Sequence, residues 1–193
     1  MNKKNLSIVM NILIIICGLL GIFIAIRLKM MKDFFLYYTN LSNVFAVIGS
    51  IVYLLTINKD SRIAKILRYS STICLILTLL VVIFILTPML KTNLFIGNYM
   101  PLYHLICPLL STISLLFFED IEGKAFYAVV PSITYGVIVI ILNIFKIVDG
   151  PYPFLKIHNQ SFLTSIFWII LIYCINYAAA LGVLKLNKII QAK

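Results

Sequence analysis

The stretch at residues 34–43, FFLYYTNLSN, begins an uncharged run that continues to Ile57 and decides how the chain folds. The run can cross a bilayer as a helix, since about 20 residues at a rise of about 1.5 Å each span the hydrocarbon layer. Near one end it carries four small polar side chains, and each unpaired polar group costs free energy in hydrocarbon. Thr39, Ser42 and Asn43 are spaced i, i+3, i+4 and share one helix face. We expect this face to line a site.

The composition extends the membrane interpretation to the whole chain. Of 193 residues, 63% are hydrophobic and only 11% are charged, which is outside the range of soluble domains. The sequence therefore predicts an all-α, polytopic integral membrane protein, with six transmembrane helices in one bundle and a single domain over residues 1–193. The predicted spans are residues 5–26, 34–57, 69–90, 99–118, 125–145 and 161–184.

The excess of cations predicts contact with membrane lipids. A net charge of +10 would suggest nucleic acid in a soluble protein, but these cations lie between predicted spans, so anionic lipid headgroups are the expected partners and nucleic acid is not. Alternating the loops places ten cations on one side and six on the other. The positive-inside rule then predicts a plasma-membrane protein with both termini cytoplasmic, although a basic cluster at residues 27–32 opposes this orientation. Thirteen lysines against three arginines are typical of an AT-rich bacterial genome.

Three further patterns concern the ends and faces of the spans. Residues 59–68 alternate cations with isoleucine and leucine and predict a short amphipathic piece on the membrane surface. The acidic residues within 119–122 predict a solvated turn. Pairs of small residues four apart, ending at Gly136 and Gly182, predict close helix packing.

His104 is expected to meet Thr39. Both lie five residues into their predicted spans from the same boundary, at a depth of roughly 7–8 Å. A histidine inside a span is a functional candidate by default, although a neutral imidazole can also simply join two helices. Pro108 has no N–H for the His104 carbonyl and predicts a kink there.

The hydroxyl of Thr39 and the imidazole of His104, at the same predicted depth in the membrane, suggest acyl transfer. A threonine hydroxyl becomes a nucleophile when a base takes its proton, and histidine is the usual base. No carboxylate lies inside a predicted span, so a dyad is expected rather than a triad, for which Asp149 would be a remote third member. No metal and no cofactor are expected. Helical N–H groups are taken to be bonded already, so side chains must stabilise the oxyanion. The candidates for this role are Asn40, Ser42 and Asn43, and the candidates for orienting the imidazole are Tyr103, Tyr135 and Asn143.

The segment at residues 149–155, DGPYPFL, separates the last two predicted spans. Its glycine and two prolines exclude a helix, while its aromatic and leucine side chains need an apolar surface. Tyr152, Pro153, Phe154 and Leu155 are therefore expected to form a lid over the mouth of the bundle. The alternative is an ordinary interfacial loop.

These motifs resemble the androgen-induced-gene family of membrane threonine hydrolases and its bacterial six-helix relatives of unassigned function. The matching elements are Phe35-Leu36-Tyr37-Tyr38-Thr39 with Ser42-Asn43, then Tyr103-His104 followed by Pro108, then Tyr152-Pro153-Phe154-Leu155. The resemblance implies hydrolysis of fatty acid esters of hydroxy fatty acids, with Thr39 as nucleophile, His104 as base and a substrate that enters from the bilayer. In the animal members the proline stands one residue further from the histidine.

Other functions stay open at this stage. The main alternative is a non-enzymatic membrane protein that binds a lipid or small amphiphile in the same pocket. A transporter would usually show repeats, which are not evident. Haem ligation would need His158, which falls in a loop at another height. Cys107, one turn from His104, is a rival nucleophile, and no C-x-x-C pair suggests a disulfide framework or a zinc site.

Overall fold

The computed structural model describes residues 2–192, and within them all regular secondary structure is helical, with no strand. The predicted all-α class is therefore confirmed. The α-helices are α1 (Lys3–Arg27), α2 (Tyr38–Thr56), α3 (Arg62–Val81), α4 (Thr87–Leu90), α5 (Cys107–Phe118), α6 (Ala125–Ile144) and α7 (Phe162–Gln191). Three 3-10 helices, η1 (Phe34–Leu36), η4 (Pro153–Leu155) and η5 (Ile157–Asn159), and two π-helices, η2 (Val82–Leu86) and η3 (Leu102–Ile106), complete the elements.

Five helical segments are long and apolar enough to cross a bilayer: α1, α2, the continuous segment Arg62–Leu90, α6 and α7. The segment Leu102–Phe118 is apolar but shorter, so the sixth crossing stays a prediction. Large apolar side chains are exposed on the outer helices, as at Phe162 on α7, which is 78% exposed. An apolar surface of this extent is consistent with a membrane protein whose outer faces contact lipid.

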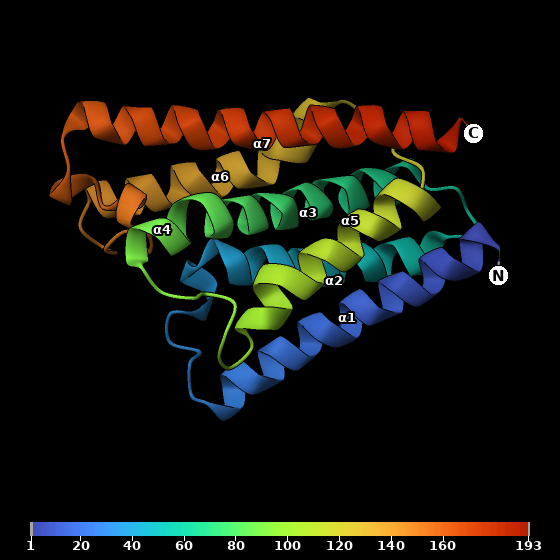
Figure 1. The fold of residues 1–193 in the computed structure, drawn as a ribbon, viewed down its shortest axis with the longest axis horizontal. Helices are drawn as coiled ribbons and strands as arrows, with labels where there is room; N and C mark the ends of the chain where they lie inside the picture. Colours follow the sequence, from blue (N-terminus) through green and yellow to red (C-terminus); the bar gives the residue numbers. More distant parts are fainter. Residues whose placement is uncertain (1, 193) are drawn as a thin grey trace.

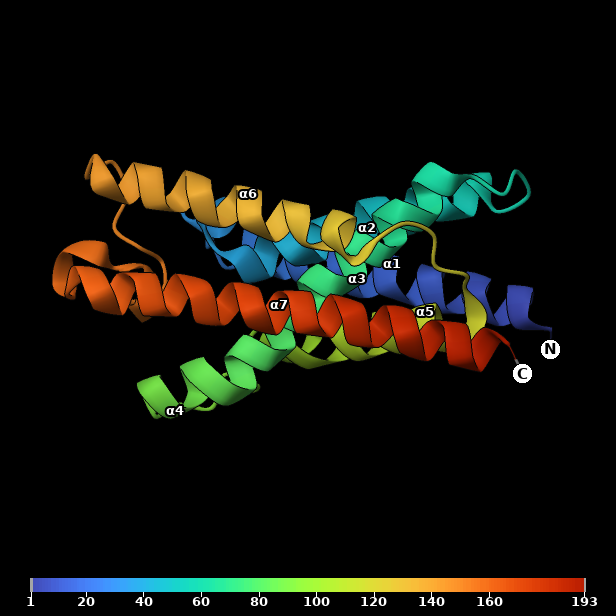
Figure 2. The same cartoon turned by 90° about the horizontal axis from the view of Figure 1, so that it is seen from above.

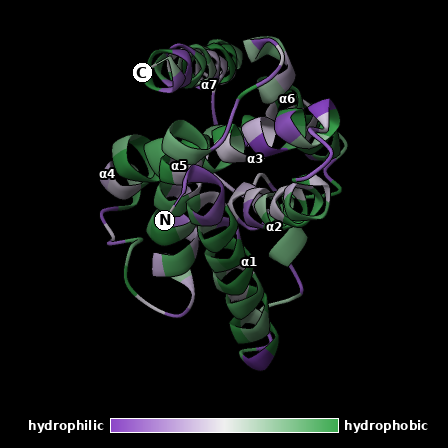
Figure 3. Cartoon of the chain, turned by 90° about the vertical axis from the view of Figure 1, so that its right-hand side faces the viewer, coloured by the Kyte–Doolittle hydropathy of each residue, from purple (hydrophilic) through white to green (hydrophobic). Residues whose placement is uncertain are grey.

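Helix α3 lies at the centre of the bundle. It packs against α2, α5, α6 and α7, while α1 covers α2 and α5 on the far side from α7 (Figures 1 and 2). The outer helix α1 is hydrophobic along most of its length (Figure 3), whereas α3 buries a series of hydroxyl side chains, namely Ser70, Ser71, Thr72 and Thr78. Polar groups thus gather in the interior of the bundle. The two ends of the chain lie at the same end of the bundle (Figure 1).

Each π-helix ends two residues before a proline. Val82–Leu86 is followed by Thr87 and Pro88, and Leu102–Ile106 by Cys107 and Pro108. Proline lacks an N–H and its ring crowds the carbonyl four residues back, and a wider turn relieves that contact. The kink that Pro108 predicts therefore takes the form of a widened turn with His104 at its centre.

Two predictions about the membrane surface are wrong in part. Helix α3 begins at Arg62, so most of the expected surface piece is the first part of a long helix, and Arg68 within it is fully buried. Glu119, expected in a solvated turn, is also buried. The reason is that the two side chains pair: Arg68 Nε donates to Glu119 Oε2 and Nη2 to Oε1, both at 3.1 Å.

Hydroxyl and amide groups complete the shell around this buried ion pair. Arg68 Nη1 donates to Thr72 Oγ1 at 3.1 Å and to Ser111 Oγ at 3.0 Å. Asn11 Nδ2 donates to Glu119 Oε1 at 2.9 Å, and the Ser114 hydroxyl donates to the same oxygen. These contacts join α1, α3 and α5 at one level and replace the water that both charges lose.

Glycines allow close packing at only some of the expected positions. Gly136 packs against the Tyr173 side chain of α7, as its spacing predicts. At Gly182 an added Cβ would meet no atom within 4 Å, and Ala178 is exposed, so the predicted close packing at that pair is wrong.

Substitution of Gly21 by leucine is expected to destabilise the fold by about 1–3 kcal/mol. A Cβ at Gly21 would collide with the Tyr103 ring, whose hydroxyl donates to the Gly18 carbonyl at 2.8 Å and so cannot move freely. The matched control is Gly182→Leu, for which we expect little change. Thermal unfolding in detergent measures both, and equal losses for the two variants would contradict the packing argument.

Candidate functional site

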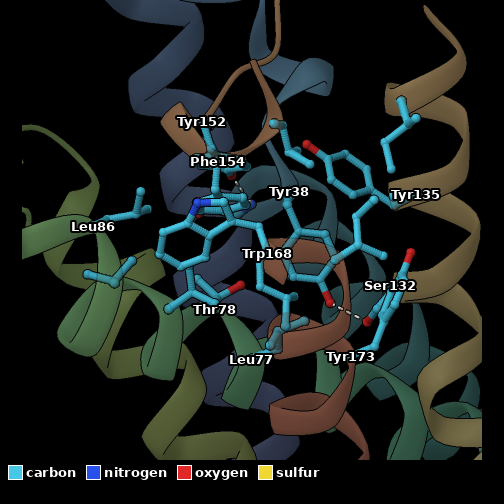
Figure 4. A pocket seen from close by; sticks show the side chains of 18 residues that line it. Tyr38, Leu77, Thr78, Leu86, Ser132, Tyr135, Tyr152, Phe154, Trp168 and Tyr173 are labelled. Carbon is cyan, nitrogen blue, oxygen red and sulfur yellow. Dashed lines mark hydrogen bonds between the residues drawn. The ribbon is translucent and has the colours of Figure 1, made fainter. Parts of the chain in front are cut away.

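A cavity lies among α2, α3, α6 and α7 (Figure 4). The parts of these helices that line it are toward the end of the bundle opposite the chain termini (Figure 1). Its free volume is about 60 Å³, which is enough for part of an acyl chain or for a few waters. The wall is mostly apolar and aromatic, and includes Leu77, Val81, Leu86, Phe154, Trp168 and Ile172. A mostly apolar pocket with a few polar groups is the usual form of a small-molecule site.

Four tyrosines line this cavity, and three of their hydroxyls are held by groups at its edge. Tyr38 Oη and Ser132 Oγ share a hydrogen bond of 2.6 Å (Figure 4). Tyr135 Oη donates to the Leu36 carbonyl at 2.8 Å, and Tyr173 Oη donates to the Ile133 carbonyl at 3.4 Å. The fourth is Tyr152, from the segment before α7.

Thr39 borders the cavity from the first turn of α2. The predicted span began at Phe34, but residues 34–36 form the separate helix η1 and α2 begins only at Tyr38. The N–H groups of a first helical turn have no partner within the helix. That of Thr39 instead donates to Tyr152 Oη at 3.3 Å. The assumption that helical N–H groups near Thr39 are already bonded within the helix is therefore wrong at this residue.

His104 is 6% exposed and is oriented by a backbone carbonyl. Its Nδ1 lies 2.6 Å from the Leu94 carbonyl oxygen, and its ring meets Phe95 edge-on. Because a carbonyl can only accept, the hydrogen belongs on Nδ1, and Nε2 carries the free lone pair. This is the tautomer that a general base needs.

The three side chains predicted to orient the imidazole have other partners. Tyr103 and Tyr135 donate to the carbonyls of Gly18 and Leu36. Asn143 holds the loop before α7, donating to the Val148 carbonyl at 2.9 Å and accepting from Ile157 N–H at 3.1 Å. None of them hydrogen-bonds to His104 within residues 2–192, and the Leu94 carbonyl takes their place.

The predicted oxyanion donors are also engaged. Asn40 Nδ2 donates to the Phe34 carbonyl at 2.8 Å, and Ser42 Oγ donates to the Thr39 carbonyl at 2.9 Å. Asn43 Nδ2 donates to the carbonyls of Thr39 and Tyr103, at 2.8 and 3.2 Å. These bonds fix the start of α2 and its position against η3. They leave both amide hydrogens of Asn43 occupied.

The structure brings the segments that carry Thr39 and His104 side by side. One nitrogen, Asn43 Nδ2, bonds both the Thr39 carbonyl and the carbonyl of Tyr103, the residue before His104. No hydrogen bond joins the Thr39 hydroxyl to the imidazole in the described part of the chain, and His104 is not among the residues that line the cavity. The two helices are neighbours at this level, and the dyad itself stays a prediction.

The segment predicted as a lid packs onto the bundle. Tyr152, Phe154 and Leu155 are buried and line the cavity, and Pro153 begins the short helix η4. The Tyr152 and Phe154 rings stack at 5.3 Å, and Phe154 also contacts Trp168. The segment thus forms one wall of the cavity, while any lid movement stays a prediction.

Several residues that line the cavity were not predicted from the sequence. Trp168 and Ser132 line it although no role in the site was expected for them, and Tyr38 lines it although it was expected only as part of the motif before Thr39. Only the tertiary fold brings these residues together. Among residues 2–192, no group of three or more His, Cys, Asp or Glu side chains is arranged to hold a metal ion. No protein-family model, curated protein or solved structure matches this chain.

Proposed function

We propose that the protein is an intramembrane lipid ester hydrolase in which Thr39 is the nucleophile and His104 the general base. The observation that carries the proposal is the Nδ1 hydrogen bond of His104 to the Leu94 carbonyl, which leaves Nε2 able to accept a proton. The bundle would cross the plasma membrane six times, with Leu102–Phe118 as the sixth crossing and both termini cytoplasmic. The motifs shared with the androgen-induced-gene family support the same reading.

The reaction would proceed through an acyl-threonine. Thr39 Oγ1 attacks the ester carbonyl carbon and passes its proton to His104 Nε2, while the carbonyl π pair moves onto oxygen. The tetrahedral intermediate collapses, the bond from carbon to the alkoxide oxygen breaks, and the alcohol leaves with the proton from His104. Water then repeats the sequence on the acyl-threonine and releases the carboxylic acid.

The apolar wall of the cavity indicates the substrate class. Hydrocarbon side chains on α3 and α7, such as Leu77, Val81 and Ile172, suit an acyl chain. The cavity lies between helices whose outer faces are apolar, so a lipid ester could reach it from the bilayer. Membrane lipids are the proposed partners.

A second candidate is a non-enzymatic protein that binds a lipid or amphiphile. It is favoured by the absence of a Thr39–His104 hydrogen bond in residues 2–192 and by the separation of His104 from the cavity lining. Catalytic hydrogen bonds are often long without substrate and tighten in its presence. The two candidates therefore differ in one measurable property: the hydrolase turns over a lipid ester, and the binding protein does not.

Labelling with a fluorophosphonate probe tests the hydrolase. We expect a covalent adduct on Thr39 of the purified protein, located by mass spectrometry, and complete loss of labelling in Thr39→Ala. The control is Thr134→Ala, an exposed threonine on α6 that bonds only its own helix, and it should label as the wild type does.

Labelling that survives Thr39→Ala would overturn the assignment of the nucleophile. Equal retention of co-purified lipid by the wild type and Thr39→Ala, with no adduct and no hydrolysis, would instead support the binding protein.

A further inference from the structure

Tyr152 reaches the proposed nucleophile from a different part of the chain. It lies in the segment between α6 and α7, is nine-tenths buried, and accepts the Thr39 N–H at 3.3 Å. Thr39 and Tyr152 also line the same cavity. The phenol oxygen of Tyr152 therefore lies at the backbone of the residue proposed as the nucleophile.

Two aromatic neighbours fix the direction of the Tyr152 ring. The ring stacks on Phe154 with an interplanar angle of 10°, and Tyr37 packs against it edge-on with centroids 6.0 Å apart. A donor held in place in this way needs little reorganisation during a reaction. The packing therefore gives Tyr152 the rigidity expected of a group that stabilises a transition state.

We propose that Tyr152 is a further catalytic residue, whose O–H donates to the oxyanion formed when Thr39 attacks an ester. This inference rests on the proposed function. The oxyanion is the former carbonyl oxygen of the carbon that becomes bonded to Thr39 Oγ1. A phenol that already bonds the Thr39 N–H and lines the same cavity is therefore close to the place where this oxygen develops its charge. In the step, the carbonyl π pair moves to oxygen, the Tyr152 proton stays on the phenol, and the Thr39 proton goes to His104.

The state of the phenol suits this role. Burial raises the pKa of Tyr152 to about 12, although its hydrogen bond with the Thr39 backbone acts in the opposite direction. The group is therefore a protonated donor at neutral pH. Because its oxygen accepts the Thr39 N–H, the O–H bond is polarised and its hydrogen points away from that N–H.

Other groups at the cavity are less suited to the task. The hydroxyls of Tyr38, Tyr135 and Tyr173 are bonded to Ser132 or to backbone carbonyls. The amide of Asn43, one of the three candidates from the sequence, has both hydrogens occupied. Tyr152 is left as the tyrosine whose hydroxyl contacts Thr39.

The test is the rate at which the fluorophosphonate probe modifies Thr39 in Tyr152→Phe. Removal of an oxyanion donor lowers such rates by about 10²–10³-fold, and we expect a loss of this order with unchanged thermal unfolding and unchanged retention of lipid. The matched control is Tyr37→Phe, which keeps the ring contact with Tyr152 and should label at the wild-type rate.

The labelling results test the proposed hydrolase function and the role of Tyr152 separately. A wild-type protein without an adduct on Thr39 removes the proposed function, whereas a labelled wild type with equally fast Tyr152→Phe overturns only the role of Tyr152. If Tyr152→Phe does not fold, fluorinated tyrosines at position 152 change the acidity of the phenol and keep its shape. The labelling rate should rise with that acidity while the phenol stays protonated, and a rate independent of acidity would overturn the inference.

Discussion

Arg68→Met is expected to destabilise the folded protein by about 3–5 kcal/mol, because removal of one partner leaves the other charge buried without compensation. Both side chains of the Arg68–Glu119 pair are fully buried, and the arginine supplies two of the hydrogen bonds to the carboxylate. Without it, Glu119 would keep only the neutral donors Asn11 and Ser114. Unfolding in a mild detergent, followed by circular dichroism against temperature or denaturant, measures the loss.

A paired substitution separates this charge effect from lost packing. Arg68→Met combined with Glu119→Met should recover most of the stability, since apolar side chains of similar volume can replace a buried ion pair at little net cost. The control is Arg62→Met, because Arg62 is 72% exposed and lies 3.8 Å from Glu122, and we expect a change below about 1 kcal/mol there. A wild-type stability for Arg68→Met alone would show that the pair contributes nothing.

His104→Ala is expected to lower the rate of Thr39 acylation by about 10²–10⁴-fold, the usual contribution of a general base. The helix around His104 should persist, because the main tertiary bond lost is the one from Nδ1 to the Leu94 carbonyl. The rate of phosphonylation at Thr39 and the hydrolysis of a lipid ester, both in detergent micelles, measure the effect.

His158→Ala is the matched control for His104. His158 lies exposed in η5, where its Nε2 bonds the Asn143 carbonyl at 2.8 Å, so its loss should leave acylation unchanged. A His104→Ala protein that reacts as fast as the wild type would remove the imidazole from the mechanism.

The helical class and most helix positions follow from hydropathy. The start of α2 could not be predicted from hydropathy, because residues 34–36 are as apolar as the helix and yet form η1. Its true start at Tyr38 matters chemically, since it places Thr39 in a first turn with a free N–H. Side-chain type alone could not show that.

The buried ion pair and the imidazole partner escaped prediction for different reasons. Arg68 stands near the end of an apolar run, where a long cation usually extends to the headgroups, and its partner is 51 residues away. The Leu94 carbonyl has no sequence signature, because every residue carries one. The placement of Thr39 and His104 at one level depended on helix rise alone, and the two segments are indeed neighbours.

The widened turns before Pro88 and Pro108 each take in about one residue more than an ordinary turn. On an α-helix a single extra residue rotates everything beyond it by about 100°. The faces of the helix before and after each widened turn are therefore out of phase. A helical wheel drawn straight through residues 102–118 would assign the imidazole to the wrong side. The same offset lets one segment turn its packing residues toward α1 and its histidine toward the loop that follows α4.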